Sequence, residues 1–167
     1  NESDQHPVHG VANGEVLIAT VYNAIRANEE LWKSTLLIVL YDEHGGFYDH
    51  VYPDPNRADL GATVAPDPYT SAFKFNQLGV RVPAILVSPW LPRGVTHIKY
   101  DHTSILHYAG AKWGVDLGAL GLRVPQANGF EKEFAQKIGE DTPTALPQPA
   151  PTLTPQTTPL TSHQQAL

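Results

Sequence analysis

The sequence predicts an α/β fold with a largely parallel sheet, because strand and helix patterns alternate along the chain. Two short, continuous apolar runs, within residues 34–41 and 80–88, are typical of strands that are covered on both faces. Apolar residues at helical spacing precede the first run, over 13–28, and follow the second, over 101–113. This order of helix, strand, long connection, strand and helix indicates the α/β class.

Composition and charge exclude several kinds of protein. The 167 residues carry 17 acidic and 11 basic side chains, and the resulting net charge of −6 argues against a nucleic-acid partner, which selects for basic patches. No apolar run approaches the roughly 20 residues that cross a bilayer, so no transmembrane segment is expected. The absence of Cys excludes disulfides and thiolate zinc sites, and it leaves the redox compartment open.

The chain divides by composition into a globular region and a tail. Residues 1–140 have enough apolar material for a core, whereas 141–167 are mostly Pro, Thr and Gln, which predicts a disordered tail or a linker. Between the two strand patterns, the Pro-rich segment 51–75 is expected to form a functional or mobile loop. A last short amphipathic helix is expected over 130–138.

The densest cluster of polar side chains follows the first predicted strand, over residues 41–50 (YDEHGGFYDH). In open α/β sheets, ligands bind beyond the carboxyl ends of the strands. The adjacent carboxylates of Asp42 and Glu43 are costly there unless a cation neutralises them, and hard cations prefer oxygen ligands. The alternative is a charged turn that reverses at Gly45 and Gly46, and the spacing alone does not separate the two interpretations.

Two histidines elsewhere are further candidates. His6 lies in a polar segment beside Asp4, and the alternative to a site role is a solvated loop histidine. His102 opens the second long helix, where it either belongs to a cap with Asp101 and Thr103 or lies at an anion-binding helix end. The sequence has no P-loop, no G-x-G-x-x-G and no G-x-S-x-G, so it shows neither a nucleotide-binding glycine loop nor an esterase elbow.

Four segments resemble, in the same order, motifs of the bacterial and plant phosphoesterase family. That family includes phosphatidylcholine-type (non-specific) phospholipases C and a class of acid phosphatases. The four segments are 4–7 (DQHP), 35–51 (TLLIVLYDEHGGFYDHV), 78–90 (LGVRVPAILVSPW) and 101–105 (DHTSI). The resemblance covers residues 1–115 and leaves the tail outside.

The resemblance implies phosphoester hydrolysis through a Ser or Thr nucleophile and a divalent metal ion, Ca²⁺ or another hard cation. It also implies an alkaline-phosphatase-like three-layer sandwich with a central mixed, largely parallel sheet. Asp42 and Glu43 match the acidic pair at the metal, His6 matches a phosphate-side histidine, and His102 is a further candidate for the catalytic acid. The implied partner is a phosphoester or phospholipid substrate, and the implied location is secreted or periplasmic.

Two features of the family are absent from this chain: its early Glu-Asn motif and the nucleophile segment that follows it. The chain also begins at Asn1 and contains no Met. We therefore expect residues 1–140 to be the carboxy-terminal part of a phosphoesterase domain whose amino-terminal part is missing, and we expect the isolated chain to be inactive. The alternatives are a truncated, inactive remnant and a scaffold piece that binds a metal ion without catalysis.

Overall fold

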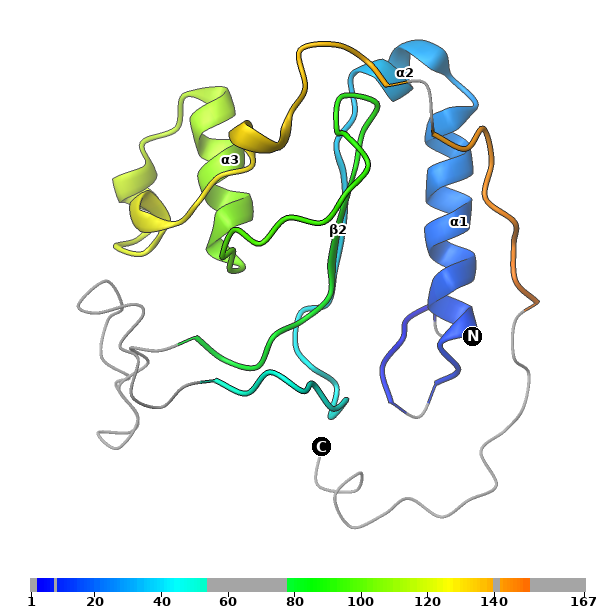
Figure 1. Ribbon diagram of the computed structural model, residues 1–167, viewed down its shortest axis with the longest axis horizontal. Coiled ribbons are helices and arrows are strands. Elements are labelled where there is room, and N and C mark those ends of the chain that lie inside the picture. Colours follow the sequence, from blue (N-terminus) through cyan, green and yellow to red (C-terminus); the bar gives the residue numbers. More distant parts are fainter. Residues whose placement is uncertain (1–2, 8, 54–77, 140–141, 151–167) are drawn as a thin grey trace. The chain divides into compact units, whose positions relative to one another are not determined.

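The computed structural model describes residues 3–7, 9–53, 78–139 and 142–150, and the chain forms two compact units (Figure 1). Unit 1 consists of Asn1–Thr35 and the carboxy-terminal segment that begins at Pro143, and unit 2 consists of Leu36–Thr142. Both helices and strands are present, so the chain has the expected mixture of α and β structure. Most of the predicted loop 51–75 and residues 151–167 of the predicted tail lie outside the described residues.

The first predicted helix forms as α1, Ala12–Arg26, in unit 1. The apolar spacing predicted the helix but not its buried face, since Leu17 and Val21 are exposed whereas Tyr22 is buried. The reason is a contact that the periodicity cannot indicate. The Tyr22 ring packs edge-to-face on Trp32, with 5.8 Å between the ring centroids.

Trp32 belongs to α2, Glu29–Lys33, a helix that the sequence pattern did not predict. Five residues are too few for a helical period to show. Its start is nevertheless set by sequence, because the Asn28 side chain accepts a hydrogen bond from the backbone N–H of Leu31 at 2.9 Å.

The two strands of unit 2 pair in antiparallel fashion, which corrects the expected largely parallel sheet within the described residues. Strand β1, Leu37–Leu40, lies beside β2, Ala84–Val87, with Leu37 opposite Val87 and Leu40 opposite Ala84 (Figure 1). The expected cover on both faces is also wrong here, since β1 is half-buried throughout and Ile85 is 57% exposed. A continuous apolar run indicates a strand but carries no information on its direction of pairing.

The second long helix of the prediction forms as α3, Thr103–Trp113, and ends at Gly114 in the left-handed conformation, φ +68°. The sequence placed Ile105, Leu106 and Ala109 inward, but Leu106 is exposed. The buried positions of α3 are instead Ser104 and Gly110.

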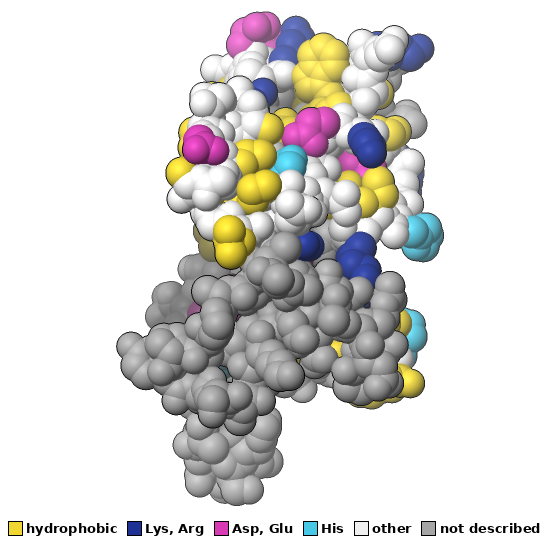
Figure 2. All heavy atoms as spheres, turned by 90° about the vertical axis from the view of Figure 1, so that its left-hand side faces the viewer, with side chains coloured by type: hydrophobic (Ala, Val, Ile, Leu, Met, Phe, Trp, Pro, Cys, Tyr) yellow, Lys and Arg dark blue, Asp and Glu magenta, His cyan; other side chains and the backbone are white. Residues whose placement is uncertain are grey.

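Two short 3-10 helices, η2 (Leu117–Leu120) and η3 (Val124–Gln126), pack against α3. η2 can lie this close to α3 because Gly110 has no Cβ, and a Cβ there would lie 2.5 Å from Cδ2 of Leu117. On this face of the molecule, hydrophobic side chains are interspersed with charged ones (Figure 2).

The short helix expected over 130–138 is wrong, because only η4, Glu131–Glu133, forms there. Backbone donors that a longer helix would use inside itself are directed elsewhere: Ala135 N–H donates to the Trp90 carbonyl oxygen at 2.8 Å, and Gly139 N–H donates to that of Pro89 at 2.9 Å. A cluster of aromatic rings fixes the same segment. They are Tyr100, Tyr108, Phe130 and Phe134, with ring centroids 5.1–5.8 Å apart.

The described part of the carboxy-terminal segment, residues 142–150, is extended and bonded to α1. The Tyr22 hydroxyl donates to the Pro143 carbonyl oxygen at 2.5 Å, and Gln148 donates to the Thr20 hydroxyl at 3.0 Å. The Pro-rich composition did not indicate this contact. Among the helices of the described ranges, none has the length and apolar composition that a membrane crossing requires.

Candidate phosphoester site

The acidic pair lies where the sequence predicted it, directly after β1. Asp42 and Glu43 are both exposed, and each carboxylate bends back onto its own turn. Asp42 Oδ1 accepts a hydrogen bond from the Glu43 N–H at 3.0 Å, and Glu43 Oε2 accepts one from the Gly45 N–H at 2.8 Å. Gly45 and Gly46 have φ of +60° and +77°, so the predicted glycine reversal forms in a conformation that other residues rarely adopt.

The loop that follows the acidic pair is tied to the segment before β2 by a two-pronged ion pair. Arg81 donates from Nε to Asp49 Oδ2 at 2.8 Å and from Nη2 to Asp49 Oδ1 at 2.9 Å. The hydrogen bond from Arg81 is the main reason why the pKa of Asp49 lies below its ordinary value, and a backbone bond from Val51 adds to the effect. The carboxylate of Asp49 is therefore engaged in holding the loop.

His102 reaches the same strand end from α3. Its Nε2 lies 3.1 Å from the backbone carbonyl oxygen of Tyr41, the residue before Asp42. A carbonyl oxygen can only accept, so this bond requires the proton on Nε2. The neutral ring then has its lone pair on Nδ1. The structure thus brings the His102 ring to the backbone of the residue that precedes Asp42, and the catalytic role of His102 stays a prediction.

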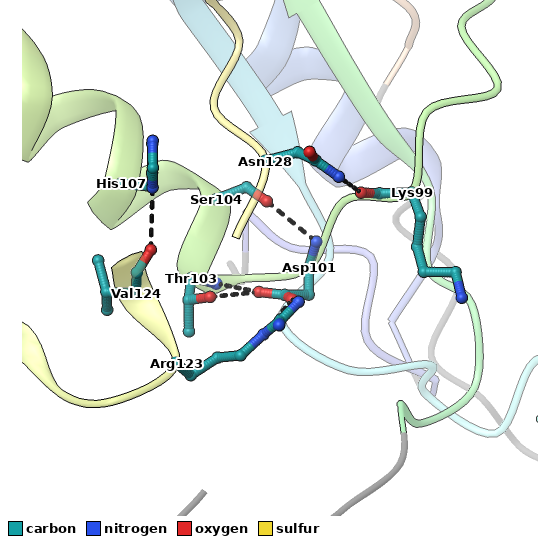
Figure 3. A network of polar contacts seen from close by, with 8 residues as sticks. All are labelled: Lys99, Asp101, Thr103, Ser104, His107, Arg123, Val124 and Asn128. Carbon is teal, nitrogen blue, oxygen red and sulfur yellow. Dashed lines mark hydrogen bonds and ion pairs between the residues drawn. The ribbon is translucent and has the colours of Figure 1, made fainter. Parts of the chain in front are cut away.

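A network of polar contacts fixes the start of α3 (Figure 3). Asp101 Oδ2 accepts from Arg123 Nε at 2.9 Å and from Nη2 at 2.5 Å, while Asp101 Oδ1 accepts from the Thr103 N–H at 2.8 Å and from the Thr103 hydroxyl. The Asp101 N–H in turn donates to the Ser104 hydroxyl at 3.1 Å. Burial raises the pKa of Asp101, but the bonds from Thr103 and Arg123 outweigh it, and the net pKa lies below the ordinary value.

His6 lies in unit 1, whereas Asp42, Glu43 and His102 lie in unit 2. The His6 N–H donates to Asp4 Oδ1 at 2.9 Å, and the same oxygen lies 2.8 Å from Nδ1 of His9. The side-chain bond to His9 is the main cause, and the backbone bond to His6 the next, of an Asp4 pKa below its ordinary value. Asp4 therefore organises both histidines of this loop.

Asp42 and Glu43 offer oxygen ligands of the kind that a hard cation prefers, but they offer only part of a site. Over the described ranges, no group of three or more His, Cys, Asp or Glu side chains gathers in a way that could hold a metal ion. A cation such as Ca²⁺ takes about six to eight oxygen ligands. The metal role of the pair therefore stays a prediction.

Three contacts near the predicted residues were missed by the sequence pattern. Arg81 lies within the resembling segment 78–90, and His9 lies two residues after the segment 4–7. Their positions near the motifs were therefore the one available signal. Arg123 gave none, because its partner Asp101 is 22 residues away and no spacing rule links them.

Comparisons with known proteins agree with the motifs. Residues 1–116 match the model of the family described as "Phosphoesterase family". Over 161 residues the chain is 39% identical to non-specific phospholipase C6 of Arabidopsis thaliana, with 89% of this chain and 30% of that protein aligned. It is 36% identical to non-specific phospholipase C1 of the same plant over 159 residues, covering 87% of this chain and 29% of that protein.

A bacterial relative extends the comparison. The chain is 35% identical over 118 residues to hemolytic phospholipase C of Pseudomonas aeruginosa, with 66% of this chain and 16% of that protein aligned. The chain thus spans less than a third of the length of these relatives. With its motifs in the family's order and most of its length matched, the chain belongs to the phosphoesterase family.

Proposed function

We propose that this chain is the carboxy-terminal part of a phosphoesterase domain that hydrolyses phosphate esters, of the phospholipase C or the acid phosphatase type. The observation that carries the proposal is the family match over residues 1–116, together with relatives that are named phospholipases C. The substrate is a phosphoester, either a phospholipid or a phosphomonoester. The nucleophile, a Ser or Thr, lies in an amino-terminal part of the same domain.

Asp42 and Glu43 contribute two of the oxygen ligands of a divalent cation, Ca²⁺ or another hard cation. A bound cation supplies charge neutralisation for the phosphoryl oxygens. The exposed position of both carboxylates directly after β1 supports this role. The ligands that complete the coordination come from the amino-terminal part.

His102 acts as the catalytic acid, and His6 contacts the phosphate. With Nε2 of His102 held on the Tyr41 carbonyl oxygen, the protonated ring carries its second proton on Nδ1. As the Ser or Thr oxygen bonds to phosphorus and the P–O bond to the leaving group breaks, that proton passes to the leaving oxygen, so no strong base is released and the ring keeps the Nε2 proton. His6 lies beside Asp4, whose carboxylate fixes the loop that presents it.

The complete domain has the three-layer architecture of the alkaline phosphatase type. Half-buried β1 and the 57% exposed Ile85 of β2 support this proposal, since an interior strand pair needs further strands or helices on its faces. The amino-terminal part supplies them. Further strands beside β1 and β2 turn the antiparallel pair into one corner of a mixed sheet.

The test is an assay of the full-length protein against phosphatidylcholine and an aryl phosphate monoester, each with Ca²⁺, Mg²⁺, Mn²⁺ and Zn²⁺ in turn. We expect metal-dependent turnover of at least one substrate, and the preferred one assigns the type. The matched variants are His102→Ala and His97→Ala, since His97 is an exposed histidine with no role in the site. Loss of turnover in both variants, or in neither, contradicts the role of His102.

The 167-residue chain on its own is expected to show no turnover in the same assay, because it has no recognised nucleophile. Metal-dependent turnover of this chain that Glu43→Gln abolishes would place the whole site within it and refute the proposal that it is a fragment. Metal binding by the full-length protein without turnover of any phosphoester would instead support the alternative of a metal-binding scaffold or an inactive remnant.

A further inference from the structure

We propose that Arg123 is a positioning residue for His102, and that it acts through Asp101. The inference rests on the role proposed for His102 in the phosphoester site. Arg123 lies beyond residues 1–116, which match the family model, and outside all four resembling segments. Its place in the contacts of the described residues is what points to it (Figure 3).

The Arg123 guanidinium holds one carboxylate oxygen with two donors. Nε and Nη2 lie 2.9 Å and 2.5 Å from Asp101 Oδ2, and the side chains of Asp101 and Arg123 are only 14% and 21% exposed. A partly buried carboxylate needs such compensation, because its charge is poorly solvated. Lysine carries the same charge but cannot form this two-donor arrangement.

Asp101 passes this constraint to the first turn of α3. Its second oxygen accepts from both the backbone N–H and the hydroxyl of Thr103, and its own N–H is held by Ser104. His102 lies between these anchored residues. The backbone of His102 is therefore fixed from both sides, while its ring remains exposed.

A second contact attaches α3 to the segment that carries Arg123. Nδ1 of His107, one turn further along α3, lies 2.9 Å from the carbonyl oxygen of Val124, the residue after Arg123. Val124 is among the most deeply buried residues of the described chain. The 123–124 segment is thus anchored in the core and holds α3 at two successive turns.

This arrangement holds His102 in position for the 3.1 Å contact between its Nε2 and the Tyr41 carbonyl oxygen. That contact selects the ring tautomer with the proton on Nε2 and fixes the orientation of the ring, and so the direction in which Nδ1 faces. Without the Arg123 side chain, the Asp101 carboxylate loses two of its donors, and α3 loses one of its two attachments to the 123–124 segment, the one beside His102. A displacement of about 1 Å at a reacting group is enough to lower turnover strongly.

The first arm of the test observes the contact itself. In the full-length protein with ¹⁵N-labelled histidine, His102 is expected to show the Nε2–H tautomer and a proton–proton contact with Tyr41. Arg123→Ala and the milder Arg123→Lys are expected to lose or weaken both. The control Arg93→Ala removes an exposed arginine outside this network and is expected to leave them unchanged.

The second arm separates positioning from general stability by a double-mutant cycle in kcat and KM. Arg123→Ala is expected to lower kcat about 10-fold with KM nearly unchanged, as for other residues that orient a functional group through a second residue. Arg123→Lys is expected to recover only part of the loss. In the His102→Ala background, Arg123→Ala is expected to change kcat by less than about 2-fold, since the group it positions is gone.

Three results decide the matter. An equal loss of kcat with and without His102 would show that Arg123 supports the fold in general, and it would overturn the proposal. An intact Tyr41–His102 contact in both Arg123 variants would overturn it as well. If His102→Ala leaves kcat unchanged, the proposed catalytic role of His102 fails, and the spectroscopic arm alone then decides whether Arg123 positions that ring.

Discussion

The side-chain amide of Asn23 forms hydrogen bonds in both directions with the backbone of Leu146, 123 residues further along the chain. Asn23 Nδ2 donates to the Leu146 carbonyl oxygen at 3.0 Å, and Asn23 Oδ1 accepts from the Leu146 N–H at 2.8 Å. The amide thereby forms with Leu146 the pair of hydrogen bonds that a neighbouring strand would form in a sheet. This pairing joins α1 to a segment whose composition predicts no structure.

Asn23→Ala is expected to destabilise unit 1 by about 1–3 kcal/mol, because two hydrogen bonds worth about 0.5–1.5 kcal/mol each are lost. Urea unfolding followed by Trp32 fluorescence in a Trp90→Phe, Trp113→Phe background reports on this unit. Amide exchange at Leu146 reports on the contact. Asn23→Asp keeps the acceptor and loses the donor, so the stability of its unit 1 is expected to lie between those of the parent protein and Asn23→Ala. Unchanged exchange at Leu146 in Asn23→Ala would contradict the pairing.

Truncations divide the carboxy-terminal segment into a bound part and a remainder. Composition predicts that all of 141–167 is removable, but residues 143–148 carry hydrogen bonds to α1. A chain that ends at Ala150 is expected to keep the full stability of unit 1, whereas one that ends at Thr142 is expected to lose helical signal and thermal stability. Equal melting temperatures for the two chains would show that residues 143–150 contribute nothing to stability and that the whole segment is dispensable.

The sequence was sufficient where local pattern decides structure. The periods of α1 and α3, the apolar runs of β1 and β2, and the glycine reversal after Glu43 are all local, and each was predicted within a few residues. The buried face of α1 depends on its contact with Trp32, and the antiparallel pairing depends on how β1 and β2 meet in space. Sequence periodicity carries no information on either partner, so neither feature was predictable.

The candidate site divides in the same way. Asp42, Glu43 and His102 could be chosen as candidates from their motifs, and the contact of His102 with Tyr41 brings its ring to the residue before Asp42. Arg123 could not, because an ion pair across 22 residues leaves no periodic trace. Chemistry-bearing side chains are visible in a motif, whereas the residues that hold them are set by tertiary packing.

Asp42→Asn and Glu43→Gln are expected to lower the turnover of the full-length protein by orders of magnitude while changing its free energy of unfolding by less than about 0.5 kcal/mol. The first effect follows from the proposed loss of a charged metal ligand, and the second from the exposure of both side chains. Steady-state assays in excess metal and urea unfolding measure the two quantities.

Asp116→Asn is the matched control for the acidic pair. Asp116 is an exposed aspartate that, like Asp42, accepts a backbone N–H of its own turn, that of Gly118 at 3.0 Å. Asp116 lies outside the proposed site, so the turnover of Asp116→Asn should equal that of the parent protein. Near-normal turnover of Asp42→Asn in a metal-replete assay would remove the metal-ligand role from the pair.

The ion pair of Asp101 and Arg123 predicts an acid-dependent stability. The folded-state pKa of Asp101 lies below the unfolded value of 3.8, so its contribution is fully present above that value and is lost as the pH falls through the folded pKa. Asp101→Asn is therefore expected to be less stable than the parent protein at pH 7 and to lose less stability between pH 5 and pH 2. Parallel stability curves for the two proteins over this range would show that Asp101 is not the titrating group.

Gly14 is a close-approach position that links α1 to the loop of His6. A Cβ at this position would lie 2.3 Å from Cγ of Gln5 and 3.0 Å from the backbone carbon of Asp4. Gln5 cannot simply rotate away without cost, because its side-chain amide donates to the Val11 carbonyl oxygen at 3.2 Å. Gly14→Ala must therefore displace the loop.

Two effects of Gly14→Ala oppose each other, and they can be measured separately. Alanine favours the helix by about 1 kcal/mol over glycine, so the helical circular dichroism signal should be kept or increased. The displaced loop should lose the contact between Asp4 and His9, which raises the pKa of Asp4 toward its ordinary value and is visible in the carboxyl ¹³C titration. In the full-length protein, turnover should fall because His6 moves with the loop.

Gly94→Ala, where a Cβ meets nothing within 4 Å, is the control and should leave both readouts unchanged. A normal Asp4 titration in Gly14→Ala would show that the loop accommodates the methyl group, and a normal turnover despite an altered titration would remove His6 from the site.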